Sequence, residues 1–236
     1  LEGISIPFIG EIPLYLRTKK GILRKPLPEV KAVVVKEGSR DIINEAFRVL
    51  RTNLEFMTDN ESQSNVIVVT SFNPGSGKSF LTMNMAVSLA IKNKKVLVID
   101  GDMRHASTSS YVDSPQKGLS DYLNGRIEEI SDIVISDKRH ESLHILPVGV
   151  IPPNPTELLF SKRLKLLIDS VRAQYDYVLI DCPPIELVAD TQIIEKLADR
   201  TIFVVRAGLL ERSMLAELEN IYNEKKYKNM SLILNG

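Results

Sequence analysis

The segment SFNPGSGKSF, residues 71–80, combines residue types that bind phosphate groups. Gly75 and Gly77 can adopt the positive φ angles that turn successive backbone N–H groups toward phosphate oxygens. Lys78 would add a positive charge, and Ser79 a hydroxyl group that suits Mg²⁺. The apolar run NVIVVT precedes the segment and LTMNMAVSLAIK follows it, so we expect a strand, a loop and a helix. This order predicts a phosphate-binding loop, with the positive end of the helix toward the phosphates.

The segment departs from the common phosphate-loop pattern G-x-x-x-x-G-K-S/T at one position. The pattern has a glycine where this chain has Phe72. A glycine-rich turn carrying a solvated lysine is the alternative, but it does not explain the flanking strand and helix. The residues expected to contact a bound nucleotide are Asn73, Pro74, Gly75, Ser76, Gly77, Lys78, Ser79 and Phe80.

Two carboxylates follow the next predicted strand, KVLVID, within the segment DGDMR. Asp100 and Asp102 could hold a hard cation or accept a proton from a hydroxyl group. In isolation, this spacing is more typical of a surface turn. A second acidic strand end beside a phosphate loop reverses that preference, so both residues are candidates for catalysis.

A third acidic strand end, Asp181, follows the run YVLI and precedes Pro183 and Pro184. A carboxylate at a strand tip can orient Mg²⁺ or its water during phosphoryl transfer. A strand-ending aspartate is common, and this one gains weight from the other two motifs. We interpret the neighbouring Cys182 as a small buried side chain rather than a nucleophile, because no histidine lies near it in the sequence.

Short β-branched runs alternate with helical patterns along most of the chain. The predicted strands are residues 65–70, 95–100, 143–148, 177–181, 201–205 and 231–235. The predicted helices are residues 39–60, 78–92, 185–197 and 211–225, with more than one helix between residues 156 and 173. Several strands are apolar on both faces, as expected in a parallel sheet with helices on each side. We therefore predict an α/β fold with a doubly wound, mostly parallel sheet flanked by helices. Ligands of such folds bind beyond the carboxyl ends of the strands, where all three motifs lie.

Length and composition are those of a globular protein. The 236 residues suffice for one large domain, of which 44% are hydrophobic and 25% charged. Thirty basic residues balance thirty acidic ones, so no overall charge favours nucleic acid and we expect no such partner. The single cysteine excludes an internal disulfide and a cysteine metal cluster. No apolar run approaches the roughly 18 residues of a spanning helix.

We divide the chain into an irregular lead-in, residues 1–30, and a domain that spans residues 31–236. The lead-in alternates short apolar pieces with four prolines and the basic stretch RTKKGILRK, which predicts no core of its own. A membrane-proximal segment is one interpretation, and a solvated basic loop is the other. Because the sequence begins with Leu1 rather than Met, we expect a longer parent protein.

The stretch SRDIINEAFRVLRTNLEFMTDN predicts an amphipathic helix with Ser39 as its N-cap. Glu45, Arg48 and Arg51 are three residues apart and would share a broad face of this helix. A local Glu–Arg pair, worth about 0.2–0.5 kcal/mol, is one interpretation. A contact between subunits is the other, and it is favoured because the apolar side of the helix already faces the core.

Together, NPGSGKS, VLVIDGDMR and VLIDCPP resemble the Walker A, Walker A′ and Walker B motifs of the bacterial tyrosine kinases, the cytoplasmic domains of polysaccharide co-polymerases. EAFRVLRTNLEF resembles the E-x-x-R-x-x-R helix of that family, and PPNPTELLFSKRLKLLI its proline-rich helix entry. The resemblance covers residues 32–235. It implies a P-loop NTPase of the deviant Walker group, like the septum-positioning and plasmid-partition ATPases. Those ATPases carry a lysine where this chain has Asn73, so the resemblance favours the kinases.

The resemblance implies an ATP- and Mg²⁺-dependent protein-tyrosine kinase that autophosphorylates in trans and regulates exopolysaccharide or capsule synthesis and export. Lys78 and the loop amides would bind the β and γ phosphates. Ser79 would ligate Mg²⁺, and Asp102 and Asp181 would position the ion directly or through water. Asp100 would accept the proton of the tyrosine hydroxyl, although Asp100 and Asp102 could exchange roles.

The resemblance also implies partners and a location. The helix of Glu45, Arg48 and Arg51 would join subunits into a homo-oligomeric ring that presents the tyrosine-containing tail of one subunit to its neighbour. Further expected partners are a transmembrane co-polymerase portion or adaptor and a cognate tyrosine phosphatase. The expected location is the cytoplasmic domain of a bacterial inner-membrane protein. Asn235 would lie near the adenine, or would only cap the last strand.

The sequence departs from the family where a tyrosine-rich tail usually follows the last strand, because it stops at Gly236. We interpret Tyr222 and Tyr227 as ordinary face residues of a helix rich in Lys and Glu rather than as acceptors. Two other functions are considered: a nucleotide-switched ATPase of the partition type, and a nucleotide-binding assembly module with little catalysis. Asn73 argues against the first, and the complete acidic motifs argue against the second.

Overall fold

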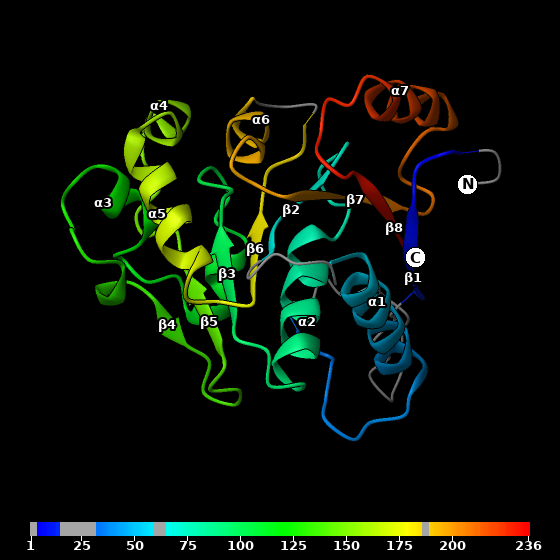
Figure 1. The fold of residues 1–236 in the computed structure, drawn as a ribbon, viewed down its shortest axis with the longest axis horizontal. Coiled ribbons are helices and arrows are strands. Elements are labelled where there is room, and N and C mark those ends of the chain that lie inside the picture. The colour runs from blue at the N-terminus through cyan, green and yellow to red at the C-terminus, as the bar shows by residue number, and fades with distance from the viewer. Residues whose placement is uncertain (1–3, 15–31, 59–64, 186–188) are drawn as a thin grey trace, which may run out of the picture.

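The computed structural model describes residues 4–14, 32–58, 65–185 and 189–236, and it has an eight-stranded sheet at its centre (Figure 1). The strand order is β1-β8-β7-β2-β6-β3-β5-β4. The strands are Phe8–Ile12 (β1), Asn65–Ser71 (β2), Val96–Asp100 (β3), Ile135–Ser136 (β4), Leu143–Leu146 (β5), Tyr177–Asp181 (β6), Arg200–Arg206 (β7) and Ser231–Asn235 (β8). Strands β4 and β5 are antiparallel, and the other neighbours are parallel. The predicted fold class is confirmed.

Helices cover both faces of this sheet. They are Ile42–Thr58 (α1), Lys78–Ala90 (α2), Leu119–Leu123 (α3), Pro155–Leu159 (α4), Lys162–Arg172 (α5), Asp190–Glu195 (α6) and Arg212–Asn223 (α7), with 3-10 turns at Thr108–Val112 (η1) and Ile130–Asp132 (η2). The central strand β2 is apolar on both sides: Ile67 and Val69 pack with α1 and α2, and Val66 and Val68 pack with α3 to α6. Helix α7 covers β7 and β8 on the second face. None of the described helices is long and apolar enough to cross a membrane.

Helix α2 is held by a buried polar contact as well as by its apolar side chains. Asn84 is buried in the middle of the helix, and its Oδ1 accepts hydrogen bonds from the backbone N–H groups of Val34 and Val35 at 2.7 and 3.1 Å. A buried amide without partners would cost stability, so these bonds fix the extended segment at residues 32–36 against α2. The helix that follows the phosphate loop is therefore fixed at its middle as well as at its start.

The lead-in was predicted to be irregular throughout, and this is wrong for residues 8–12. They form β1, which pairs in parallel with β8 and buries Ile9 and Ile12 in the core. The physical reason is that β8 would otherwise expose a free sheet edge. The basic stretch at residues 17–25 lies outside the described residues, so its membrane-proximal character stays a prediction.

The predicted N-cap of α1 is also wrong. Asp41, and not Ser39, caps the helix, because Asn44 N–H donates to Asp41 Oδ1 at 2.9 Å and the helix begins at Ile42. Hydrogen bonds from Asn44 lower the pKa of Asp41 to about 2. Ser39 supports the cap indirectly, since its hydroxyl group donates to Asp41 Oδ2 at 2.7 Å.

Other helix boundaries differ by a few residues from the predictions. The helices expected between residues 156 and 173 are α4 and α5, with a break at residues 160–161. The helix expected at 185–197 is the shorter α6, and residues 186–188 lie outside the described part. Helix α7 ends at Asn223, which leaves Tyr227 beyond it.

Candidate active site

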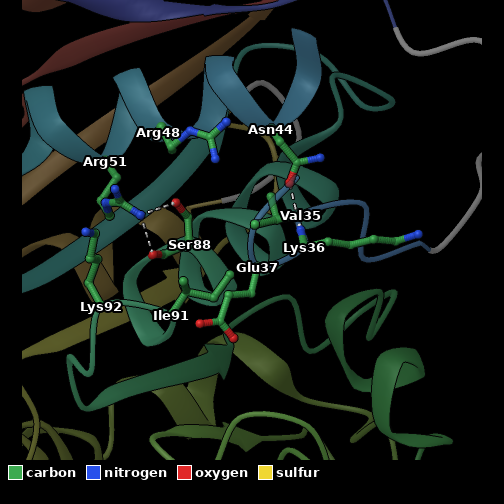
Figure 2. Close-up of a pocket in the computed structure, with 10 residues that line it drawn as sticks. Val35, Lys36, Glu37, Asn44, Arg48, Arg51, Ser88, Ile91 and Lys92 are labelled. Carbon is green, nitrogen blue, oxygen red and sulfur yellow. Dashed lines mark hydrogen bonds between the residues drawn. The ribbon is translucent and has the colours of Figure 1, made fainter. Parts of the chain in front are cut away.

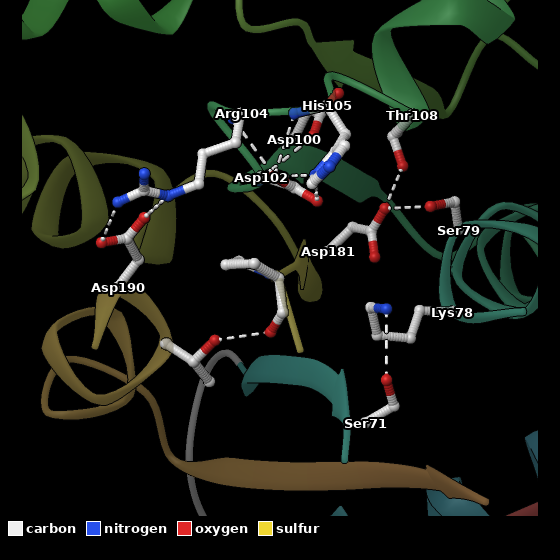
Figure 3. Close-up of polar contacts among 12 residues, drawn as sticks. Ser71, Lys78, Ser79, Asp100, Asp102, Arg104, His105, Thr108, Asp181 and Asp190 are labelled. Atoms are coloured by element: carbon white, nitrogen blue, oxygen red, sulfur yellow. Dashed lines mark hydrogen bonds and ion pairs between the residues drawn. The ribbon is translucent and has the colours of Figure 1, made fainter. Parts of the chain in front are cut away.

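The three predicted motifs lie at the carboxyl ends of three adjacent strands, β2, β6 and β3 (Figure 3). The phosphate loop, residues 72–77, follows β2. Asp181 ends β6, and it is the register partner of Asp100 at the end of β3. Chain order would place β6 far from β2 and β3, but the sheet inserts it between them. The fold therefore brings together residues about 100 positions apart, as expected for ligand sites of open α/β sheets.

The phosphate loop has the backbone geometry that the glycines predicted. Gly75 and Gly77 have φ angles of +72° and +86°, in the left-handed region that favours glycine. The hydroxyl groups of Ser71 and Ser76 both donate to the Asn73 carbonyl, at 2.6 and 2.8 Å, and these bonds shape the turn. Helix α2 starts directly after the loop, so its positive end faces the loop.

Lys78 is the first residue of α2, and its ammonium group turns back toward the strand end. Its Nζ donates to Ser71 Oγ at 3.2 Å, and the side chain is buried. The Lys78 charge also acts on Asp181, where it opposes the rise in pKa that burial causes. The structure thus places one positive charge between the loop and the acidic strand ends.

Asp181 joins the phosphate loop to the segment that follows β3. Its Oδ2 accepts hydrogen bonds from Ser79 Oγ at 2.5 Å and Thr108 Oγ1 at 2.6 Å. Its Oδ1 is buried and has no hydrogen-bond partner in the described part of the chain. Burial is the main cause that raises the pKa of Asp181. A buried carboxylate oxygen without a donor is costly, and a cation would satisfy it.

The residues around Asp181 fit a magnesium ion that is bound together with a nucleotide. The described residues contain no cluster of three or more His, Cys, Asp or Glu that could hold a metal alone. Mg²⁺ often binds through one or two protein oxygens and completes its shell with water and phosphate oxygens. Two neighbouring oxygens are of this kind: the hydroxyl oxygen Oγ of Ser79 and the carboxylate oxygen Oδ1 of Asp181, which has no partner among the described residues.

Asp100 is fully buried beside Asp181. Its Oδ2 accepts hydrogen bonds from Ser109 N–H and Ser109 Oγ, both at 2.6 Å, and its Oδ1 accepts one from Asp102 N–H at 3.3 Å. Burial, and then the charge of Asp181, raises the pKa of Asp100 to about 8, although the Ser109 hydrogen bonds oppose the rise. The two carboxyl groups therefore compete for ionisation in the protein without a cation.

Asp102 lies closer to the surface, with 6% of the residue exposed against 0% for Asp100. Its Oδ1 accepts hydrogen bonds from the backbone N–H groups of Arg104 and His105, each at 3.1 Å. The His105 ring nitrogen Nδ1 lies 3.2 Å from Asp102 Oδ2. The Asp102 carboxylate thus stabilises the turn of its own loop. Asp181, by contrast, contacts Ser79 directly.

Arg104 forms a network that the sequence did not predict. Its Nε donates to Asp190 Oδ2 at 3.0 Å, and its Nη2 donates to Thr156 Oγ1 at 3.0 Å. Thr156 Oγ1 in turn donates to Asp190 Oδ1 at 2.6 Å, and Asp190, whose contacts with Arg104 are drawn in Figure 3, is fully buried. The network ties the loop of Asp102 to α4 and α6. The arginine of DGDMR was visible in the sequence, but its partners are 52 and 86 residues away and have no local pattern.

Asn235, at the end of β8, supports the phosphate loop in this structure. Its Nδ2 donates to the Ser76 carbonyl at 2.9 Å, and the residue is buried. A Cβ atom on Gly77 would lie 2.2 Å from this Nδ2. The side chain thus occupies the space that glycine leaves open, which is a role beyond the two considered from the sequence. Its proximity to an adenine stays a prediction.

Glu45, Arg48 and Arg51 of α1 do not share one exposed face. Arg48 forms an exposed ion pair with Glu45 at 2.6 Å, which matches the local interpretation. Arg51 is turned inward and only 7% exposed, and its Nη1 donates to the Ser88 carbonyl of α2 at 2.9 Å. A role of these residues between subunits stays a prediction, with Arg51 serving first to dock α1 on α2.

Two residues judged unreactive from the sequence are buried. Cys182 is fully buried, and burial raises the pKa of its thiol well above the usual value. Tyr227 is not on a helix face, as was predicted; it lies beyond α7 and packs edge-on against Phe203, with ring centroids 5.1 Å apart. Burial raises the pKa of Tyr227 to about 12. A hydroxyl group so enclosed is not an accessible phosphate acceptor.

Sequence comparisons agree with this geometry. Residues 64–233 match a family model described as an AAA domain. The tyrosine-protein kinase YwqD of Bacillus subtilis is 35% identical over 206 residues, which cover 86% of this chain and 85% of YwqD. The putative tyrosine-protein kinase AmsA of Erwinia amylovora is 40% identical over 184 residues, or 77% of this chain. The chain spans only 24% of the length of AmsA.

Solved structures show the same relationship. The kinase domain of the Escherichia coli tyrosine kinase ETK superposes with a TM-score of 0.83 at 30% identity, over 98% of this chain and 91% of that domain. The septum site-determining protein MinD of Pyrococcus horikoshii, complexed with Mg-ADP, superposes with a TM-score of 0.61 at 28% identity, over 73% of this chain and 70% of MinD. The fold is thus that of the nucleotide-binding P-loop ATPases, and the chain belongs to the bacterial tyrosine-protein kinase family.

Proposed function

We propose that this chain transfers the γ-phosphoryl group of ATP to tyrosine hydroxyl groups of protein tails, and that it does so to regulate exopolysaccharide or capsule synthesis. The contact of Asp181 with both Ser79 and Thr108 carries the proposal. It joins a phosphate loop to a second acidic segment. Phosphoryl transfer requires mainly positioning and charge neutralisation, which this arrangement can supply.

In this proposal Lys78 and the loop N–H groups bind the β and γ phosphates, and Ser79 and Asp181 hold Mg²⁺ with help from Asp102. Bound Mg²⁺ would neutralise charge that develops on the phosphate oxygens. Asp100 is assigned as the acceptor of the tyrosine proton: it lies beside Asp181 in the sheet, and a cation bound there would favour the ionised form that a proton acceptor requires. Asp102 is the more exposed carboxyl group, so the exchange of these two roles needs an experiment.

The test is the formation of phosphotyrosine on a synthetic tyrosine-rich peptide with ATP and Mg²⁺. We expect Lys78→Met to lower the rate by about 100-fold or more, as expected when a charge that stabilises the transition state is removed. Lys138→Met removes an exposed lysine elsewhere and should leave the rate unchanged. Equal phosphate transfer by the wild type and Lys78→Met, or no transfer by either, would contradict the proposal. A larger loss in Asp102→Asn than in Asp100→Asn would exchange their roles.

A partition-type ATPase is the second candidate, and the likeness to MinD favours it. Its discriminating result is ATP hydrolysis that membranes or DNA stimulate, without phosphotyrosine.

A further proposal is that Glu45 and Arg48 help to join subunits into a ring with a co-polymerase partner. Light scattering of Glu45→Ala tests this, since loss of the oligomer is expected and an unchanged mass would refute it. Equal polysaccharide output in cells carrying the wild type and Asp100→Ala/Asp102→Ala would favour a purely structural role.

A further inference from the structure

A second polar pocket lies at the end of α2 that is distant from the phosphate loop. It has a volume of about 280 Å³ and lies between α1, the end of α2 and the segment at residues 35–38, which ends in a turn (Figure 2). The helix rise places it roughly 20 Å from the start of α2. Its lining carries four cationic side chains and one carboxylate, namely Lys36, Arg48, Arg51, Lys92 and Glu37. It is therefore distinct from the site of Asp181.

Arg51 is the central residue of this pocket. Its Nη1 donates to Ser88 O at 2.9 Å and to Ser88 Oγ at 3.3 Å, which satisfies a carbonyl group near the end of α2. Its Nε is buried and has no hydrogen-bond partner in the described part of the chain. In a guanidinium group, Nε and Nη2 form the edge that binds two oxygens of a carboxylate or phosphate. The edge of Arg51 that suits an oxyanion thus includes the Nε–H group, which has no acceptor among the described residues.

Lys92 adds a second positive charge on the same side. Its side chain extends toward Arg51 in Figure 2, and both residues line the pocket. The carboxylate of Glu37 lies on the other side of Ile91 in the same view, and Glu45 is already paired with Arg48 at 2.6 Å. Arg51 and Lys92 are like charges that line one pocket, so they repel each other, and a bound anion would relieve that repulsion.

We propose that this pocket binds a phosphate-sized oxyanion between the Nε edge of Arg51 and the ammonium group of Lys92. The volume is at the small end of the range for ligand pockets, which suits one anionic group rather than a whole nucleotide. Because Arg51 belongs to α1 and Lys92 follows α2, the anion would fasten these two helices together. The inference does not depend on the proposed kinase activity.

The test uses the Nε–H resonance of Arg51 in two-dimensional ¹H–¹⁵N spectra of the whole chain, titrated with inorganic phosphate at constant ionic strength. Arg51→Lys assigns the resonance, and thermal unfolding shows whether that variant is folded. We expect a saturable shift of the Arg51 resonance. This readout separates the pocket from the phosphate loop, whose backbone amides will also respond to phosphate.

Lys92→Met should weaken the phosphate affinity at Arg51 by about fivefold, as expected for the loss of one partly exposed charge. Lys138→Met removes an exposed lysine outside the pocket and should leave the phosphate affinity at Arg51 unchanged. An Arg51 resonance that does not move while the loop amides do would overturn the proposal. Equal weakening by Lys92→Met and Lys138→Met, or a shift with acetate but not with phosphate, would also overturn it.

Discussion

Asp100 and Asp181 are register partners at the carboxyl ends of β3 and β6, so two buried carboxyl groups lie side by side on adjacent strands. Burial and mutual repulsion together raise the pKa of Asp100 to about 8. Lys78 alone does not neutralise both groups. The two carboxyl groups therefore destabilise the protein when no ligand is bound, and their negative charge would attract a cation.

The first prediction is a stability that falls as the pH rises. An unfolded chain ionises Asp100 near its ordinary pKa of 3.8, whereas the native state holds the proton up to about pH 8. Between these values the native state binds more protons, so the free energy of unfolding decreases with pH. Urea unfolding in the presence of EDTA should give a free energy of unfolding that is lower at pH 8 than at pH 5, by on the order of a few kcal/mol.

Asp100→Asn should flatten this dependence, because the amide does not ionise. Asp113→Asn, at an exposed aspartate, is the matched control and should keep the slope of the wild type. If the wild type and Asp100→Asn had equal slopes from pH 5 to pH 8, Asp100 would not be the buried acid that the structure describes.

The second prediction concerns the two glycines of the phosphate loop. A Cβ atom on Gly77 would collide with Asn235 Nδ2, whereas one on Gly75 meets nothing within 4 Å. Both positions have positive φ angles, so each alanine variant carries a backbone cost of about 1–2 kcal/mol. Gly77→Ala should therefore weaken nucleotide binding more than Gly75→Ala, as measured by calorimetry.

Removing the obstructing side chain provides the control for this comparison. Gly77→Ala/Asn235→Ala should bind nucleotide more tightly than Gly77→Ala, although the backbone cost persists. If Asn235→Ala gave no relief, the collision would not explain the difference between the glycines.

The sequence allowed prediction of those site residues that belong to a local pattern, such as an apolar run followed by a polar residue. Apolar runs locate the strands, and the polar residue that ends each run marks the site, so Lys78 and Asp181 could be found without a structure. Thr108 and Asp190 could not, because a threonine or aspartate makes such contacts only after the sheet brings distant segments together. The inward turn of Arg51 was missed for a similar reason. Helical spacing gives the face of a residue, but the tilt of α1 against α2 decides whether a long side chain is buried.

The third prediction concerns two buried threonines that differ in their hydrogen bonds. Thr82 Oγ1 on α2 is buried and has no hydrogen-bond partner among the described residues, whereas Thr191 Oγ1 on α6 donates to the Pro183 carbonyl at 2.8 Å. Valine has a similar shape and lacks the hydroxyl group. Thr82→Val should raise the free energy of unfolding by about 1 kcal/mol, and Thr191→Val should lower it by about as much. Chemical denaturation of the two variants tests this, and a loss of stability in Thr82→Val would contradict it.

The last prediction is an energetic coupling between Arg104 and Asp190. Asp190 is fully buried, so Arg104→Met would leave its carboxylate, among the described residues, with the Thr156 hydroxyl as its remaining side-chain donor. Because Arg104 itself is 36% exposed, we expect a loss of about 2 kcal/mol, below the range for a fully buried pair.

A double-mutant cycle of Arg104→Met with Asp190→Asn should give a coupling of about 1–2 kcal/mol in urea unfolding. The matched control is Arg126→Met, since Arg126 pairs with Asp121 at 3.8 Å and its side chain is 72% exposed. A surface pair of this kind contributes about 1 kcal/mol or less. Additive effects of the Arg104 and Asp190 substitutions would show that the network does not fasten the loop of Asp102 to α6.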